Sequence, residues 1–197
     1  MGKGLFDLEK HFAFYGAYHS NPVNVAIHML FVWPIFYTSL ILFHFTPSVV
    51  RLPFGVCNGD GVVLNLGFVF ALVFAVFYVF MDQKAGSLAA VLCIACWVSS
   101  DCLAARLGFS LSWKVVLASQ LFCWSGQFLG HALYEKRAPA LLDNLPQALM
   151  MAPFFVLLEL LQRLCGYEPY PGFRANIHAK IAASRAEWQA KKEKKDL

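Results

Sequence analysis

The feature that most constrains this chain is a run from His11 to Val50 that contains no Asp, Glu, Lys or Arg. Only 14% of the whole chain is charged, against about 25% in an ordinary soluble domain. The two ends, residues 1–10 and 174–197, hold 14 of the 28 charged residues. This distribution excludes a disordered chain and a water-soluble enzyme, and it indicates a membrane protein.

Four windows are long and apolar enough to cross a bilayer, which takes about 20 mostly apolar residues. They cover residues 25–45, 62–81, 86–105 and 115–134. A fifth window, 146–162, is shorter and contains Pro153 and Glu159. We interpret it as re-entrant, interfacial or packed within the bundle, with a fifth full span as the alternative. The expected fold is an all-α polytopic membrane bundle with four spanning helices, this shorter fifth segment and a basic tail.

The connections between these windows are short. Residues 46–61 are rich in Pro and Gly and are expected to form a loop, while 81–86 and 106–114 are expected to form turns. Four of the six cysteines lie within apolar runs, where free Cys behaves as a small hydrophobic residue. We therefore expect no disulfide framework.

The basic tail carries the charge of the protein. Residues 174–197 supply the whole formal charge of +4, so the body, residues 1–173, is neutral and offers no basic face to a nucleic acid. The positive-inside rule places this tail in the cytosol, beside anionic lipid. Lys194 and Lys195 match the dilysine retrieval signal of endoplasmic-reticulum membrane proteins. An even number of spans then places both termini in the cytosol.

This topology brings polar residues to one membrane face. His19 and His28 lie at the start of the first span, and His131 and Glu135 lie at the end of the fourth, which returns to the same side. A helix break at Asn21-Pro22, a good N-cap and first-turn pair, lets the rings of His19 and His28 converge. Asn24 lies one turn before His28 and shares its face of the helix.

Such a set of side chains is typical of a metal site. Two or three imidazoles with a carboxylate and open positions suit non-haem Fe(II) that activates oxygen. The alternative is that each histidine is an interfacial or helix-packing residue. Glu159 has two interpretations, as a partner of a ligand histidine or as a partner of Arg163 one turn on.

Two long strings carry a resemblance to a known family. They are Y-x-x-Y-H-x-N-P-x-N within residues 1–28, and G-H-x-x-x-E-K-R-x-P-A-L-x-D-N within residues 122–160. In these stretches the chain resembles the fungal 2-hydroxy fatty acid (2-hydroxypalmitic acid) dioxygenases of the endoplasmic reticulum membrane, with their plant and bacterial relatives. The middle spans match that family only in hydrophobicity.

The resemblance implies α-oxidation: an enzyme that uses Fe(II) and O₂ to convert a 2-hydroxy long-chain fatty acid into the fatty acid one carbon shorter, in phytosphingosine degradation. The family's iron ligands map onto His19, His28 and His131. A carboxylate role falls to Glu135, Asp143 or Glu159. Lys136 and Arg137 either attract the substrate carboxylate or anchor the helix at the interface.

Two other functions are alternatives to this one. A fatty-acyl hydroxylase or desaturase with a di-iron centre needs about eight histidines by family analogy, and this chain has six. A lipid-binding or membrane-shaping protein of the endoplasmic reticulum without chemistry is the alternative outside enzymes. Membrane lipid is an expected partner in either case, and the sequence assigns no oligomeric state.

Overall fold

The computed structural model describes residues 4–48, 50–57, 60–139 and 145–194. Within them the chain is almost entirely helical, as the sequence predicts, with one two-stranded hairpin. The elements in chain order are α1 (Leu8–Tyr18), α2 (Pro22–Phe43), β1 (Val50–Cys57), β2 (Asp60–Leu64), α3 (Leu66–Met81), α4 (Gln83–Gly130), the π-helical turn η1 (His131–Glu135), α5 (Leu145–Cys165) and α6 (Phe173–Glu193).

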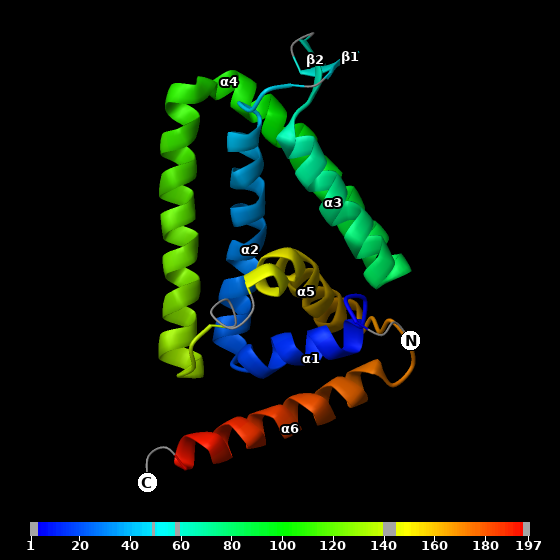
Figure 1. Ribbon diagram of the computed structural model, residues 1–197, viewed down its shortest axis with the longest axis vertical. Coiled ribbons are helices and arrows are strands. Elements are labelled where there is room, and N and C mark those ends of the chain that lie inside the picture. Colours follow the sequence, from blue (N-terminus) through cyan, green and yellow to red (C-terminus); the bar gives the residue numbers. More distant parts are fainter. Residues whose placement is uncertain (1–3, 49, 58–59, 140–144, 195–197) are drawn as a thin grey trace.

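The four predicted windows overlap α2, α3 and the two arms of α4, although residues 62–64 belong to β2. Figure 1 shows α4 running up beside α3, turning over at the top of the molecule and descending beside α2. The turn falls at Gly108, inside the predicted turn 106–114, where φ is 66° and ψ is 165°. Glycine tolerates this left-handed backbone because it has no Cβ. Among the described helices, α2, the segment Gln83–Glu135 and Ala148–Cys165 are long and apolar enough to cross a membrane, whereas α3 is shorter.

The ends of these helices follow from local sequence. The Asn21 side chain accepts a hydrogen bond from the Val23 N–H at 2.9 Å and caps α2, with Pro22 as the first helical residue. The Asp82 carboxylate accepts from the Ala85 N–H at 2.7 Å and caps α4. One extended residue, Asp82, therefore separates α3 from α4 and forms the tight turn predicted at 81–86.

Two expectations about residues 46–61 and the cysteines were wrong. The Pro- and Gly-rich segment forms much of an antiparallel hairpin, β1–β2, rather than an irregular loop. The pairing register of the two strands is irregular, so the sequence lacks the regular alternation that would predict strands. Cys102, on the arm of α4 beneath this hairpin, is disulfide-bonded. A disulfide joins positions brought together by the fold, which spacing along the chain does not reveal.

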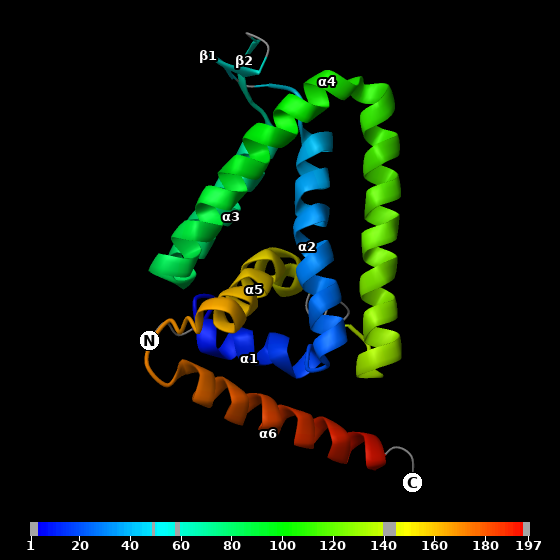
Figure 2. The same ribbon diagram turned by 180° about the vertical axis from the view of Figure 1, so that it is seen from behind.

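The short fifth segment forms α5, which crosses the bundle instead of running alongside α2. Figures 1 and 2 show it in the opening between the α2–α4 pair and the α3–α4 pair. Its Phe154 and Leu158 are fully buried. The Tyr78 hydroxyl donates a hydrogen bond of 2.8 Å to the Met150 carbonyl and ties α3 to α5. This position fits the interpretation of a segment packed within the bundle.

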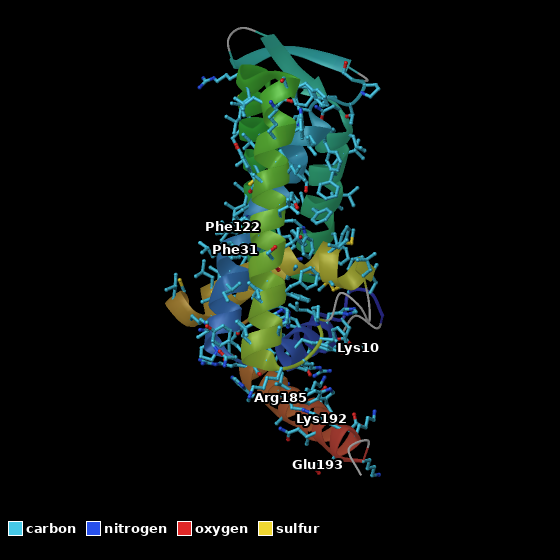
Figure 3. All side chains as sticks on the ribbon, turned by 90° about the vertical axis from the view of Figure 1, so that its left-hand side faces the viewer. Lys10, Phe31, Phe122, Arg185, Lys192 and Glu193 are labelled. Carbon is cyan, nitrogen blue, oxygen red and sulfur yellow. The ribbon has the colours of Figure 1, made fainter. Side chains whose placement is uncertain are left out.

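Two helices close the end opposite the hairpin. Helix α1 lies across the lower end of α2, and α6 runs beneath it (Figure 1). Gly16 of α1 lets Ile181 of α6 approach so closely that a Cβ there would lie 2.3 Å from its Cδ1 atom. In Figure 3 the labelled charged residues Lys10, Arg185, Lys192 and Glu193 gather at this end, and Phe31 and Phe122 lie within the α2–α4 pair. The tail is thus a helix docked on α1.

Candidate metal centre

Three histidines from separate parts of the chain meet where α1, α2 and η1 converge. His19 follows the last residue of α1, His28 lies in the second turn of α2, and His131 opens η1. Their ring centroids are 4.3, 4.8 and 4.9 Å apart, and their ligand atoms all lie within 4.8 Å of one another. The structure therefore brings together the three histidines that counting spans placed at one face.

Backbone carbonyl groups orient two of the three rings. Nδ1 of His19 donates to the Tyr15 carbonyl at 2.8 Å, and Nδ1 of His28 donates to the Asn24 carbonyl at 2.9 Å. A carbonyl oxygen only accepts, so each Nδ1 carries the proton and each Nε2 keeps its lone pair. This is how metal-binding histidines are held in one tautomer.

The third ring supplies an observation that tests whether a metal fits. Nδ1 of His131 is buried and has no hydrogen-bond partner among the residues that the structure describes, while the His131 residue is only 3% exposed. Buried polar atoms are rarely left unsatisfied, and those that are call for an explanation such as an ion. Three neutral imidazoles around one point, one with an orphaned nitrogen, fit a transition metal.

The protonation of His19 agrees with this. Burial, followed by the neighbouring His28 and His131, lowers the pKa of His19 well below its ordinary value of 6.5. The ring is therefore neutral near pH 7, and a neutral imidazole is the form that binds a metal.

Glu135 makes its hydrogen bonds with the segment that joins α1 to α2 and with Asn24. Its carboxylate accepts hydrogen bonds from the Ser20 N–H and hydroxyl, at 2.7 and 2.8 Å, and from the Asn21 N–H at 2.7 Å. The Asn24 amide donates to it at 3.2 Å. All these partners lie at the corner between α1 and α2, so Glu135 fixes the segment that carries His19.

Lys136 and Arg137 make their contacts outside the histidine cluster. Lys136 is exposed and has a left-handed backbone with φ of 51°. The Arg137 guanidinium lies 3.6 Å from the Tyr18 ring centroid and 5.2 Å from that of Trp188 on α6. It also donates to the Ala17 carbonyl at 3.1 Å. Its contacts link α1 to α6.

The other three residues that the sequence proposed for the site, Asn24, Asp143 and Glu159, have different outcomes. Asn24 is fully buried beside the centre and bonds to Glu135. Glu159 pairs with Arg163 at 2.8 Å, which was one of its two interpretations. Asp143 lies outside the described residues.

The three histidines line one cavity of about 300 Å³. Its walls come from α1, α2, α3, the second arm of α4, η1 and α5, and they are mostly aromatic and aliphatic. The apolar lining includes Phe14, Val32, Ile35, Phe36, Phe70, Phe74, Trp124, Phe128, Leu149 and Phe155. Phe36 lies eight residues beyond His28 on α2, about 12 Å along the helix. An elongated apolar molecule with a metal-binding head group fits this shape.

Sequence reasoning missed two polar residues of this cavity, Tyr15 and Gln127. Each lies one helical turn before a histidine of the centre, Tyr15 before His19 and Gln127 before His131. The i, i+4 spacing that placed Asn24 beside His28 would have found them both.

Comparisons with known proteins show which family the chain is similar to. The family model described as "2-hydroxy-palmitic acid dioxygenase Mpo1-like" matches residues 5–164. The chain is 34% identical over 169 residues to the protein named 2-hydroxy-palmitic acid dioxygenase MPO1 of Saccharomyces cerevisiae, which covers 86% of this chain and 87% of that protein. No solved structure matches the chain.

Proposed function

The chain belongs to the Mpo1-like family of 2-hydroxy-palmitic acid dioxygenases, and we propose that it uses Fe(II) and O₂ to convert 2-hydroxy long-chain fatty acids into fatty acids one carbon shorter. It is an enzyme, a dioxygenase acting on a 2-hydroxy fatty acid, and this reaction belongs to phytosphingosine breakdown. The observation that carries the proposal is the meeting of His19, His28 and His131 on the wall of an apolar cavity.

The chemistry of the donor set supports iron. Nitrogen ligands with open positions suit an ion that binds both a substrate and O₂. Bound there, Fe(II) would supply the redox chemistry and a Lewis acid for a 2-hydroxy carboxylate. The residues that would hold it are His19, His28 and His131.

The protein's own contribution is orientation and exclusion of water. The carbonyl groups of Tyr15 and Asn24 fix the tautomers of His19 and His28. Glu135 acts here as a positioning residue for the α1–α2 corner. The apolar walls bury the alkyl chain and hold the head group at one point, and such positioning lowers a barrier before any chemistry occurs.

The membrane placement is also part of the proposal. Apolar helices place the protein in a membrane, and we assign the hairpin end to an oxidising lumen because Cys102 there is disulfide-bonded. Charged residues of α1 and α6 gather at the opposite end (Figure 3). The metal centre then faces the cytosolic side of the endoplasmic reticulum membrane, with α6 along that surface.

The test is product analysis by mass spectrometry. Purified protein with Fe(II), O₂ and 2-hydroxypalmitate should yield pentadecanoate without added 2-oxoglutarate. Palmitate, which lacks the 2-hydroxyl, should remain unchanged under the same conditions. Recovery of intact 2-hydroxypalmitate from iron-loaded protein would contradict the proposal and favour a lipid-binding protein without chemistry.

A further inference from the structure

The polar side chains of the cavity fall into two groups, those that form hydrogen bonds within the protein and those that have an unpaired polar atom. At one wall, the Gln120 amide nitrogen donates to the Ile35 carbonyl at 3.0 Å and to the Thr38 hydroxyl at 2.8 Å. The Trp124 indole donates to the Gln120 carbonyl oxygen at 3.0 Å. The Ser39 hydroxyl donates to the Ile35 carbonyl at 2.8 Å. All the hydrogen-bond donors named here are therefore bonded within α2 and α4, and none of them is free to bind a ligand.

Tyr15 and Gln127 form the second group. Within the described part of the chain, the Tyr15 hydroxyl and the Gln127 Nε2 atom are buried and have no hydrogen-bond partner, and the residues are 6% and 7% exposed. An unsatisfied buried donor costs about 1–3 kcal/mol, so a protein rarely keeps two in one cavity unless a ligand satisfies them.

Both donors lie beside the metal centre. The Tyr15 ring stacks on His19 with centroids 4.2 Å apart and an interplanar angle of 18°. Gln127 precedes His131 by one turn of the same continuous helical segment, so the two share a face. A head group held at the histidines is therefore within reach of both side chains.

The charged residues in and near the cavity lining bear on which ligand group these donors would bind. The described residues that line it include no Lys or Arg. Lys136 and Arg137 follow His131 closely in sequence, but Lys136 is exposed and Arg137 contacts the rings of Tyr18 and Trp188. A carboxylate entering this cavity therefore meets neutral hydrogen-bond donors and the metal, and no cationic side chain.

We propose that the Tyr15 hydroxyl and the Gln127 amide are the carboxylate-binding subsite, donating hydrogen bonds to the head group of a long-chain fatty acid. This inference rests on the proposed function for its substrate class. Both residues bind the carboxylate, while the three histidines hold the metal.

Ligand binding to metal-free protein tests this subsite without any turnover. Competition against radiolabelled palmitate in nanodiscs gives the Kd of palmitate and of pentadecane, which has the chain but no head group. Tyr15→Phe and Gln127→Met should each raise the Kd for palmitate by about 10- to 100-fold, the loss of one hydrogen bond to a charged group. The Kd for pentadecane should stay as in the wild type.

Matched controls separate the subsite from general packing. Tyr167→Phe removes a hydroxyl that bonds to Asp82 outside the cavity, and Gln162→Met removes an unpartnered amide that does not line it. Both should bind palmitate as the wild type does. Gln127→Glu keeps the shape of the side chain and sets a carboxylate against the ligand, so it should abolish palmitate binding and spare pentadecane.

Two results would overturn the proposal. One is an unchanged palmitate Kd in Tyr15→Phe and Gln127→Met, and the other is an equal loss of palmitate and pentadecane. Because no metal is present, failure of the dioxygenase reaction leaves this measurement untouched. In iron-loaded protein the same variants should raise KM for 2-hydroxypalmitate and retain their iron.

Discussion

The carboxylate of Glu135 accepts hydrogen bonds from both the backbone N–H and the hydroxyl of Ser20, at 2.7 and 2.8 Å, across 115 positions of sequence. This pair joins the end of η1 to the corner between α1 and α2. Ser20 is the neighbour of His19, so the same contact fixes the distance between the first and the third histidine of the centre. The geometry of the histidine cluster therefore depends on Glu135.

Glu135→Ala should weaken both the fold and the metal site. It leaves the Ser20 and Asn21 donors without their acceptor, which should lower the free energy of unfolding by about 2 kcal/mol or more. Iron affinity should fall because the segment bearing His19 loses its anchor. Thermal melting and iron content of the purified protein measure the two effects. Glu159→Ala, which removes an exposed ion pair with Arg163, is the matched control and should keep its iron.

Gly130→Ala should disturb the centre through packing alone. A Cβ there would lie 2.4 Å from Oδ1 of Asn24 and 3.3 Å from Cδ1 of Ile27, so α2 and α4 would have to separate. Overpacking of this kind costs about 1–3 kcal/mol. Ser125→Ala, at an exposed position of the same helix, should change stability by less than about 0.5 kcal/mol. Equal melting temperatures for the two variants would contradict the close contact.

Phe74→Ala should shift the preference for chain length. Phe74 lines the cavity and packs on Phe36 and Phe70, with ring centroids 5.3 and 4.4 Å away. Removing its ring lengthens the space available to an alkyl chain, so longer 2-hydroxy acids should gain in kcat/KM relative to 2-hydroxypalmitate. A competition assay with a mixture of chain lengths measures the ratio. Val69→Ala on the exposed side of α3 should leave the ratio unchanged, and a shift in both variants would argue against the assigned wall.

Trp188→Ala should loosen α6 without touching the centre. The Arg137 guanidinium lies between the rings of Tyr18 and Trp188, and such contacts contribute about 0.5–1 kcal/mol at exposed sites. Amide hydrogen exchange in the last turns of α6 should therefore become faster, while iron content stays constant. Lys191→Ala is the control on the same turns. Unchanged exchange in Trp188→Ala would show that other contacts hold α6.

Much of the fold follows from the sequence because lipid leaves few choices. A backbone in hydrocarbon must satisfy its own hydrogen bonds, so the apolar windows form helices, and Pro22 and Asp82 mark where helices begin and end. The convergence of His19, His28 and His131 is expected from the same reasoning, because an even number of spans would return the chain to one face. The hairpin at 50–64 was missed because its pairing is irregular and lies outside the helical windows.

The roles of the other polar residues were beyond the sequence for a physical reason. Glu135, Lys136 and Arg137 are consecutive, yet Glu135 points to the α1–α2 corner and Arg137 to α6. The π-helical turn and the left-handed Lys136 set these directions, and neither is visible in composition. Tyr15 belongs to the first string of the family resemblance, but its role depends on the cavity, where its hydroxyl has no partner among the described residues.

The central claim is that three histidines hold one iron, and metal analysis of anaerobically purified, Fe(II)-loaded protein tests it most directly. The wild type should contain about one iron per chain. His19→Ala, His28→Ala and His131→Ala should each lose that iron and the conversion of 2-hydroxypalmitate, while His178→Ala, on the exposed side of α6, should keep both. Iron retained at the wild-type level in the three variants, or absent from the wild type, would contradict the account.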